Sequence, residues 1–240
     1  MLEREGGLSL RDARVPRTLP VAAVLFDLDG TLADTAPDLA AALNRVRGQR
    51  GMAPMPLSAL RPFASHGARG LLGAGFGITP DHADFPPLRD AFLAEYAAGL
   101  CVETRLFTGV AGLLDEIEAR HFPWGIVTNK AIRYTAPLLD ALGLSRRAGT
   151  VICGDTTPHA KPHPAPMLAA AAALGIAPTG CVYIGDAQRD VAAGVAAGMA
   201  TLVARYGYIQ PDENPAAWPA DGMLESAADL LEWLPRGAPR

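Results

Sequence analysis

The feature that most constrains the fold is an unbroken apolar run, Val21–Phe26, that ends directly at Asp27. A continuous run predicts a strand buried on both faces, because a strand with one solvated face alternates apolar and polar residues, and such buried strands occur in parallel sheets. Strands that alternate with helices predict an α/β fold built on a Rossmann-like, doubly wound parallel sheet. Further strands are expected at 124–128, 150–153, 181–184 and 201–204, and helices at 110–117, 138–142 and 164–174.

The stretch from 36 to 106 interrupts this alternation. It contains no buried-strand run, and its apolar spacing predicts one helix near 39–46 and another near 88–96. Pro37 is typical of a first helical turn. The chain is expected to close with a loop at 210–220 and a short helix at 227–234. The expected parts are therefore a flexible N-terminal arm at 1–20, an α/β core at 21–35 and 107–240, and an inserted helical cap domain at 36–106.

Composition excludes several classes of protein. Half of the residues are hydrophobic and 19% are charged, which excludes a mainly disordered chain. The formal net charge of -4 provides no basic field for nucleic acid, and no run approaches the ~20 apolar residues of a membrane span. Cys101, Cys153 and Cys181 are odd in number and unclustered, which favours a reducing cytoplasm over a disulfide framework, and the last two fit core positions. We expect a cytoplasmic monomer or homodimer whose partner is a small molecule, not a membrane or a nucleic acid.

Polar side chains follow the predicted strands at the points where these strands end. Because ligands of an open α/β sheet bind outside the carboxyl ends of its strands, we expect these side chains to converge on one site. Asp27 and Asp29 follow the first strand, Thr128, Asn129 and Lys130 the second, and Asp186 and Asp190 the fourth, while Lys161 lies downstream of the third.

The residue types at this edge favour metal-assisted phosphate chemistry. Crowded carboxylates raise one another's pKa unless a cation offsets their charge, and oxygen ligands with room for water and phosphate favour Mg²⁺. Lys161 can neutralise one phosphoryl oxygen, and Thr128 can donate to another. Of Asp27 and Asp29, one can attack while the other transfers protons. The alternatives are that both aspartates only cap the following helix, and that Lys130 is a surface charge near the mouth of the site.

Four motifs, in this order along the chain, resemble those of the haloacid-dehalogenase superfamily. They are Asp-x-Asp-Gly-Thr at 27–31, the strand-end Thr128, Lys161-Pro162, and Gly-Asp-x-x-x-Asp at 185–190. The helical insert and residues 26–35 are similar to the phosphoglycolate-phosphatase branch of that family. The resemblance implies a phosphomonoesterase that needs Mg²⁺ and forms an aspartyl-phosphate.

The resemblance also implies roles for the first two aspartates. Asp27 would be the nucleophile and a metal ligand. Asp29 would protonate the leaving alkoxide, deprotonate the attacking water and bind Mg²⁺ through its backbone carbonyl. Because Asp29 is present, a phosphate ester is expected as the substrate rather than a halide. Many relatives carry a hydroxyl or an acid where this chain has Ala187, which bears on metal geometry and not on the reaction class.

The remaining motif residues would bind the phosphoryl group and the metal. The resemblance implies that Thr128 and Lys161 hold the phosphoryl group, and the backbone N–H of Asn129 can donate to it beside Thr128. Asp186 would bind Mg²⁺ through its carboxylate. Asp190 would orient Lys161 or a metal-bound water, although a first-turn acid at a helix start is the alternative.

The expected cap carries candidates for substrate specificity. Small residues within 65–70 allow the backbone to approach a ligand closely, and Arg69, with His66 beside it, can bind a carboxylate. The alternative for Arg69 is a solvated helix-start arginine. A carboxylate occurs in 2-phosphoglycolate and in N-acetylmuramic acid 6-phosphate. Tyr206 and Tyr208 either stack on a sugar ring or pack at the end of the last strand. Segments 65–71, 123–130 and 205–215 resemble the peptidoglycan-recycling phosphatases of Gram-negative bacteria.

Two other functions fit the same fold. A phosphomutase needs an acid–base pair in its cap, and none is identified within 36–106. A non-catalytic small-molecule binding module would be expected to lose at least one motif residue, whereas Asp27, Asp29, Lys161 and Asp186 are all present. The run at 73–77 superficially resembles a nucleotide loop, but it follows no buried strand and is expected to be a cap turn.

Overall fold

The computed structural model describes residues 18–238. The arm expected at 1–20 therefore lies outside the described residues, apart from its last three positions. Of these, Leu19 is buried against the core, and its N–H donates to the carbonyl of Trp233 at 2.8 Å. The end of the expected arm thus packs on the core, because an apolar side chain there completes the sheet-covering layer.

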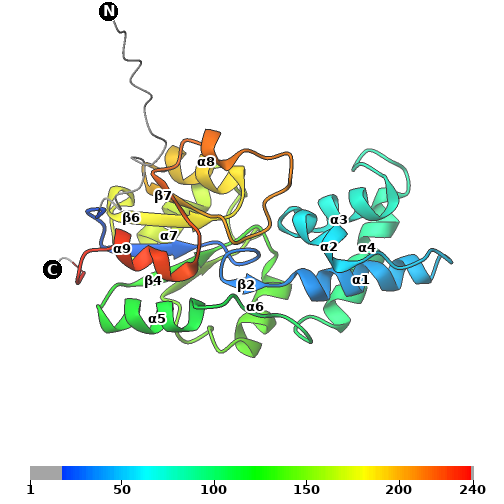
Figure 1. Cartoon of the computed structure of the whole chain (residues 1–240), viewed down its shortest axis with the longest axis horizontal. Coiled ribbons are helices and arrows are strands. Elements are labelled where there is room, and N and C mark those ends of the chain that lie inside the picture. The colour runs from blue at the N-terminus through cyan, green and yellow to red at the C-terminus, as the bar shows by residue number, and fades with distance from the viewer. Residues whose placement is uncertain (1–17, 239–240) are drawn as a thin grey trace, which may run out of the picture.

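The core is a parallel sheet of six strands in the order β5-β4-β1-β6-β7-β8 (Figure 1). The five strands predicted from apolar runs are confirmed. The sixth, β8, was not predicted, because its short sequence Gly-Met-Leu lies in a polar, proline-rich region. The strands are β1 Ala23–Phe26, β4 Trp124–Val127, β5 Thr150–Ile152, β6 Cys181–Gly185, β7 Ala200–Ala204 and β8 Gly222–Leu224.

Helices cover both faces of this sheet, which explains the unbroken apolar runs. In β1, Val24 and Phe26 pack toward one helical layer, and Ala23 and Leu25 pack toward the other. Short 3₁₀ turns at 178–180, 215–217 and 227–229 complete the core. One face carries α5 Val110–Ala119, α6 Ile132–Ala141 and α9 Leu230–Trp233, and the other carries α7 Ala165–Leu174 and α8 Gln188–Ala196 (Figure 1).

A separate helical unit, here called the cap, lies beside the sheet (Figure 1). It has its own buried cluster, and the helices predicted near 39–46 and 88–96 lie within its first and last helices. Of the run at 73–77, expected as a turn, residues 73–76 instead form the last turn of α3, where Gly75 packs directly on Leu43, and the left-handed Gly77 ends the helix. The elements are α1 Ala36–Gly48, α2 Leu57–Leu60, a 3₁₀ helix Arg61–His66, α3 Gly67–Phe76 and α4 Phe85–Ala98.

The chain enters and leaves the cap through a two-stranded antiparallel ribbon. It pairs β2 Ala33–Asp34 with β3 Arg105–Leu106. The buried carboxylate of Asp38, in the first turn of α1, accepts hydrogen bonds from the N–H groups of residues 102–104 and from the Thr104 hydroxyl, at 2.7–3.1 Å. These bonds fix the returning chain beside the outgoing one.

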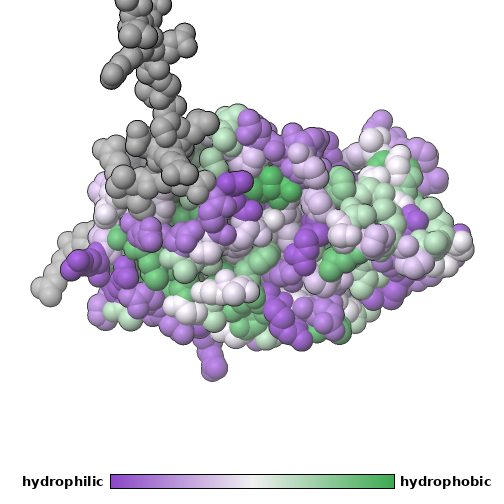
Figure 2. Space-filling model, viewed as in Figure 1, coloured by the Kyte–Doolittle hydropathy of each residue, from purple (hydrophilic) through white to green (hydrophobic). Residues whose placement is uncertain are grey.

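Hydrophilic and hydrophobic residues are interspersed over core and cap on the face seen in Figure 2. The exposed large apolar side chains belong to different elements, among them Ile132 in α6 and Leu168 in α7. Among residues 18–238, no helix has the length and apolar character that crossing a bilayer requires.

Candidate active site

The site begins where β1 ends, at Asp27. Its carboxylate is 2% exposed, and Oδ1 accepts the N–H of Leu28 at 2.7 Å and lies 2.9 Å from Lys161 Nζ. Oδ2 makes no hydrogen bond to any described residue. Burial raises the pKa of Asp27 to about 6, and the charge of Asp190 adds to this effect, while Lys161 opposes it. One oxygen is thus anchored and the other is left for chemistry.

Asp186, at the end of β6, shows the same division of its two oxygens. Oδ2 accepts the Ser65 hydroxyl at 2.6 Å and the N–H of Tyr208 at 2.8 Å. Oδ1 is buried and has no hydrogen-bond partner among the described residues. Burial raises the pKa of Asp186 to about 7, and repulsion from Asp190 and Asp27 contributes. A buried carboxylate oxygen without a donor is a position that a cation can fill.

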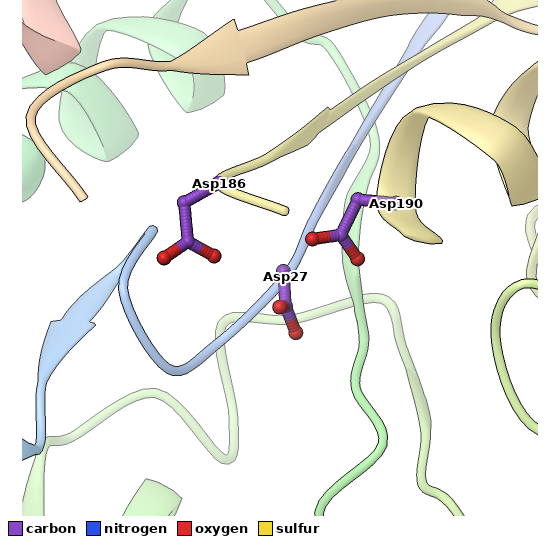
Figure 3. A group of neighbouring side chains, drawn as sticks. All are labelled: Asp27, Asp186 and Asp190. Carbon is purple, nitrogen blue, oxygen red and sulfur yellow. The ribbon is translucent and has the colours of Figure 1, made fainter. Parts of the chain in front are cut away.

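Asp27, Asp186 and Asp190 form one cluster, in which one oxygen from each lies within 4.8 Å of the others (Figure 3). Oxygen-only ligands of this kind fit a hard divalent cation. Asp190 is already occupied, because its carboxylate lies 2.7 Å from Lys161 Nζ and accepts the N–H of Ala187 at 3.0 Å. The available oxygens therefore belong to Asp27 and Asp186. The side chain of Asp29 lies outside this cluster.

Lys161 is held from several sides. Its ammonium bonds Asp27 and Asp190 and also donates to the carbonyl of Val127 at 2.9 Å and the hydroxyl of Tyr183 at 2.7 Å. The Asn129 side chain donates to the Lys161 carbonyl at 2.9 Å and accepts the Lys161 N–H at 3.0 Å. Asn129 thus holds the Lys161 loop with its amide, while its own backbone N–H bonds no described residue.

Asp29 points toward a different cation from Asp27. Its Oδ1 accepts a hydrogen bond from the Thr35 hydroxyl at 2.5 Å and one from Lys130 Nζ at 2.8 Å. Lys130 Nζ also donates to Asp29 Oδ2, at 3.1 Å. The Lys130 side chain is only 8% exposed. Its expected place as a surface charge at the mouth is therefore wrong, because cap residues cover it.

A cavity of about 670 Å³ lies between core and cap, above these aspartates. Apolar residues of α1 and α4, including Leu39 and Phe92, form part of its wall. Both expected specificity residues, Arg69 and His66, line it. Burial and the nearby Arg189 lower the pKa of His66, so its imidazole is neutral at pH 7.

Two arginines at this cavity were not identified from the sequence. Arg189 is half-buried and donates to the backbone carbonyl of Ser65 at 2.7 Å, so it links α8 to the cap. Its place within Gly-Asp-x-x-Arg-Asp is a signal that could have found it. Arg133, in the first turn of α6, stacks 4.7 Å from the ring centroid of Tyr134. Within residues 18–238, Arg133 and Arg69 make no hydrogen bond or ion pair.

Tyr206 and Tyr208 pack inside the protein and do not line the cavity. The Tyr208 hydroxyl donates to Asp34 at 2.7 Å and accepts the N–H of Ala36 at 3.0 Å, and the Tyr206 hydroxyl donates to the carbonyl of Thr31 at 3.1 Å. Of the two alternatives, packing at the end of β7 is therefore the one observed. Cys153 and Cys181 are buried, as expected.

The family model that matches the chain is described as haloacid dehalogenase-like hydrolase and spans residues 24–204. The chain belongs to this family. The matched residues of this haloacid dehalogenase-like hydrolase contain Asp27, Asp29, Thr128, Lys161, Asp186 and Asp190.

Relatives of this hydrolase carry two different phosphatase names. It is 41% identical over 214 residues to the N-acetylmuramic acid 6-phosphate phosphatase of Pseudomonas aeruginosa, covering 89% of this chain and 95% of that one. It is 42% identical over 218 residues to a phosphoglycolate phosphatase of Xanthomonas campestris pv. campestris, covering 91% and 97%. The crystal structure of a predicted phosphoglycolate phosphatase from Haemophilus somnus superposes with a TM-score of 0.76 at 26% identity, covering 89% of this chain and 97% of that one.

Proposed function

We propose that this hydrolase is a Mg²⁺-dependent phosphomonoesterase that forms an aspartyl-phosphate on Asp27. The main support for the proposal is the hydrogen bonding of the two Asp27 carboxylate oxygens. Lys161 and the Leu28 N–H hold Oδ1, while Oδ2 bonds no described residue and the side chain lines the cavity. A carboxylate with one anchored and one free oxygen suits in-line attack on a phosphorus atom.

The surrounding side chains supply the other parts of the reaction. The Thr128 hydroxyl, the Asn129 N–H and the Lys161 ammonium stabilise the charge on the phosphoryl oxygens. Asp29 gives a proton to the departing ester oxygen and later accepts one from the water that attacks the aspartyl-phosphate. Asp190 keeps Lys161 in place through their 2.7 Å ion pair.

Asp186, through Oδ1, and the backbone carbonyl of Asp29 would hold the Mg²⁺ ion, with the Asp27 carboxylate next to it. The unpartnered Oδ1 of Asp186 and the raised pKa values of Asp186 and Asp27 support a cation at this place. When bound, the ion would offset negative charge on the phosphoryl oxygens. Asp190 serves the lysine rather than the metal in this proposal, since both of its oxygens already have partners.

The cavity supports a substrate that carries a second anionic group. Arg69 and Arg133 line it without any ion pair, and guanidinium groups bind carboxylates well. Both 2-phosphoglycolate and N-acetylmuramic acid 6-phosphate carry such a carboxylate. The cavity of about 670 Å³ falls within the range of sites for drug-sized ligands, which favours the sugar acid.

The phosphomutase alternative finds no support in the cap. Within residues 18–238, the cap residues that line the cavity include no carboxylate that could pair with His66. The acid–base pair that a mutase needs there is therefore missing from the described wall.

Phosphate release with Mg²⁺ tests the proposal, with 2-phosphoglycolate, N-acetylmuramic acid 6-phosphate and p-nitrophenyl phosphate compared side by side. We expect turnover that Asp27→Asn abolishes, and a higher kcat/KM for the sugar acid. A higher kcat/KM for 2-phosphoglycolate would instead identify 2-phosphoglycolate as the better substrate. No release from any of the three esters would contradict the phosphatase proposal and revive the binding-module alternative.

A further inference from the structure

Lysine is rare in this chain, and its two copies lie at the site. Of the 21 lysines and arginines, only Lys130 and Lys161 are lysines. Lys161 Nζ lies 2.9 Å from Asp27 Oδ1, and Lys130 Nζ lies 2.8 Å from Asp29 Oδ1. An ammonium is a compact charge on a flexible stem, whereas a guanidinium is a wide planar fork. Each motif aspartate at the end of β1 therefore has its own compact cation.

The two aspartates share a pattern of anchoring. Asp27 Oδ1 is held by Lys161 and a backbone N–H, and Asp29 Oδ1 is held by Lys130 and the Thr35 hydroxyl at 2.5 Å. Asp29 Oδ2 accepts only the longer hydrogen bond from Lys130, at 3.1 Å. Two donors on Oδ1 make it the carbonyl-like oxygen of the carboxyl group. Oδ2 is then the atom that can carry and exchange a proton.

The cap closes over the other side of Lys130. Its ammonium lies 4.8 Å from the ring centroid of Tyr96, in α4. The Tyr96 side chain is 1% exposed, so its contact with Lys130 is shielded from water. A cation over an aromatic face is attracted more strongly when both are shielded from water. Lys130 is thus held between an acid of the core and an aromatic ring of the cap.

We infer that Lys130 is a positioning residue that anchors Asp29 through Oδ1 so that Oδ2 exchanges protons with the ester oxygen, and that Tyr96 holds Lys130 in this place. In the first step, the bond from phosphorus to the ester oxygen breaks, the bond from phosphorus to Asp27 Oδ2 forms, and the proton on Asp29 Oδ2 passes to the departing oxygen. Lys130 changes no covalent bond. The inference rests on the proposed phosphatase function, because it concerns the same proton transfer.

A double-mutant cycle between Lys130→Met and Asp29→Asn tests whether Lys130 acts through Asp29. With Mg²⁺ and an alkyl phosphate ester, Lys130→Met should lower kcat by about 10- to 100-fold, a part of the general acid–base contribution of 10²–10⁴, while KM stays within about 2-fold. In the Asp29→Asn background the same substitution should change kcat by less than about 2-fold, because there is no acid left to position. Arg89→Met, which removes an exposed charge from the same cap helix as Tyr96, is the matched control.

The leaving group provides a second readout. The loss in Lys130→Met should be smaller for p-nitrophenyl phosphate than for the alkyl ester, since a good leaving group needs less proton transfer. Equal losses in both Asp29 backgrounds, or equal losses with both esters, would overturn the inference while wild-type turnover keeps the phosphatase proposal intact. No turnover by the wild type would instead contradict the proposed function itself.

A pair of cap variants keeps the test independent of how well Lys130→Met folds. Tyr96→Phe retains the ring over the ammonium, and Tyr96→Leu removes it. We expect kcat close to that of the wild type in the first variant and a several-fold loss in the second, again suppressed by Asp29→Asn. A Tyr96→Leu variant with full kcat would show that the cap does not hold Lys130.

Discussion

The hydroxyl of Ser65 donates a 2.6 Å hydrogen bond to Asp186 Oδ2, so a residue of the cap directly contacts an aspartate at the end of β6. The backbone N–H of Tyr208 donates to the same oxygen at 2.8 Å. Both bonds leave Oδ1 as the available oxygen of Asp186. Cap position and metal affinity are therefore expected to depend on each other.

Ser65→Ala should raise the Mg²⁺ concentration needed for half-maximal activity by about 10-fold, the lower end of what loss of a partner behind a metal ligand costs. The physical reason is that Asp186 loses one of the two donors that orient its carboxylate. A Mg²⁺ titration of phosphate release measures the shift. Ser145→Ala, which removes an exposed serine hydroxyl outside the cap, serves as the control. An unchanged Mg²⁺ requirement would show that the Tyr208 N–H alone orients Asp186.

Without a divalent cation, stability should decrease as the pH rises from about 4 to about 7. Burial raises the pKa of Asp186 from 3.8 to about 7 and that of Asp27 to about 6. In this window the folded chain holds protons that the unfolded chain has released, so the free energy of unfolding decreases with rising pH. Saturating Mg²⁺ should remove much of this decrease.

Thermal unfolding at low and neutral pH, with EDTA and with Mg²⁺, measures this dependence. Asp186→Asn is the internal control, because it removes the carboxyl group with the higher pKa of the two. In EDTA, the unfolding temperature of this variant should depend less on pH than that of the wild type. Identical pH dependence in EDTA, in Mg²⁺ and in the variant would contradict the assignment of the effect to this cluster.

Tyr208→Phe should destabilise the fold by about 1–2 kcal/mol, because the hydroxyl bonds to Asp34 and to the N–H of Ala36 are lost in a buried place. Urea unfolding measures the loss. The ratio of kcat/KM between the sugar acid and 2-phosphoglycolate should stay the same, since the ring does not line the cavity. A changed ratio would favour the sugar-stacking alternative.

Gly207→Ala should destabilise the protein by about 1–3 kcal/mol, as overpacking does, and should weaken Mg²⁺ binding. A Cβ atom there would lie 2.4 Å from both Asp186 Cβ and the carbonyl oxygen of Gly30. Gly112→Ala is the matched control, because it adds a methyl group within α5 with no atom within 4 Å. That substitution should stabilise by about 0.5–1 kcal/mol, as glycine is unfavourable within a helix.

Arg69→Ala should raise KM about 10-fold for esters that carry a carboxylate, since a charged hydrogen bond is lost, and should change KM little for p-nitrophenyl phosphate. Arg133→Ala should behave alike, because both guanidinium groups line the same cavity. Steady-state kinetics with the two ester types separate the effects, and the exposed Arg89→Ala is the control. Equal effects on both ester types would show that these arginines do not bind the carboxylate.

The sequence predicts the sheet well because each buried strand is a short, continuous apolar run that can be recognised from its own residues. The run ending at Asp27 and the run beginning at Cys181 need no knowledge of distant residues to be recognised as strands. The convergence of Asp27, Lys161 and Asp186 follows in turn from the parallel arrangement, which brings strand ends together. The short cap helices were missed because glycine and proline obscure their apolar spacing, as in Arg61–Phe76.

The contacts between core and cap could not be predicted in this way. Lys130 is buried only because Tyr96, distant in sequence, packs over it. The Ser65 contact to Asp186 likewise depends on how the cap sits against the sheet. Such contacts are set by tertiary packing, and no local periodicity encodes them.

The cap takes the place of the turn in a β-hairpin. Strands β2 and β3 pair through Ala33–Leu106 and Asp34–Arg105, and the whole cap lies between them in the chain. The sheet therefore has no need of the cap to define its topology. The aspartates at the ends of β1 and β6 would stay in register if the segment between these two strands changed in length. The cap reaches those aspartates through side-chain contacts such as that of Ser65 with Asp186, so these contacts, and not the path of the backbone, couple it to the reaction.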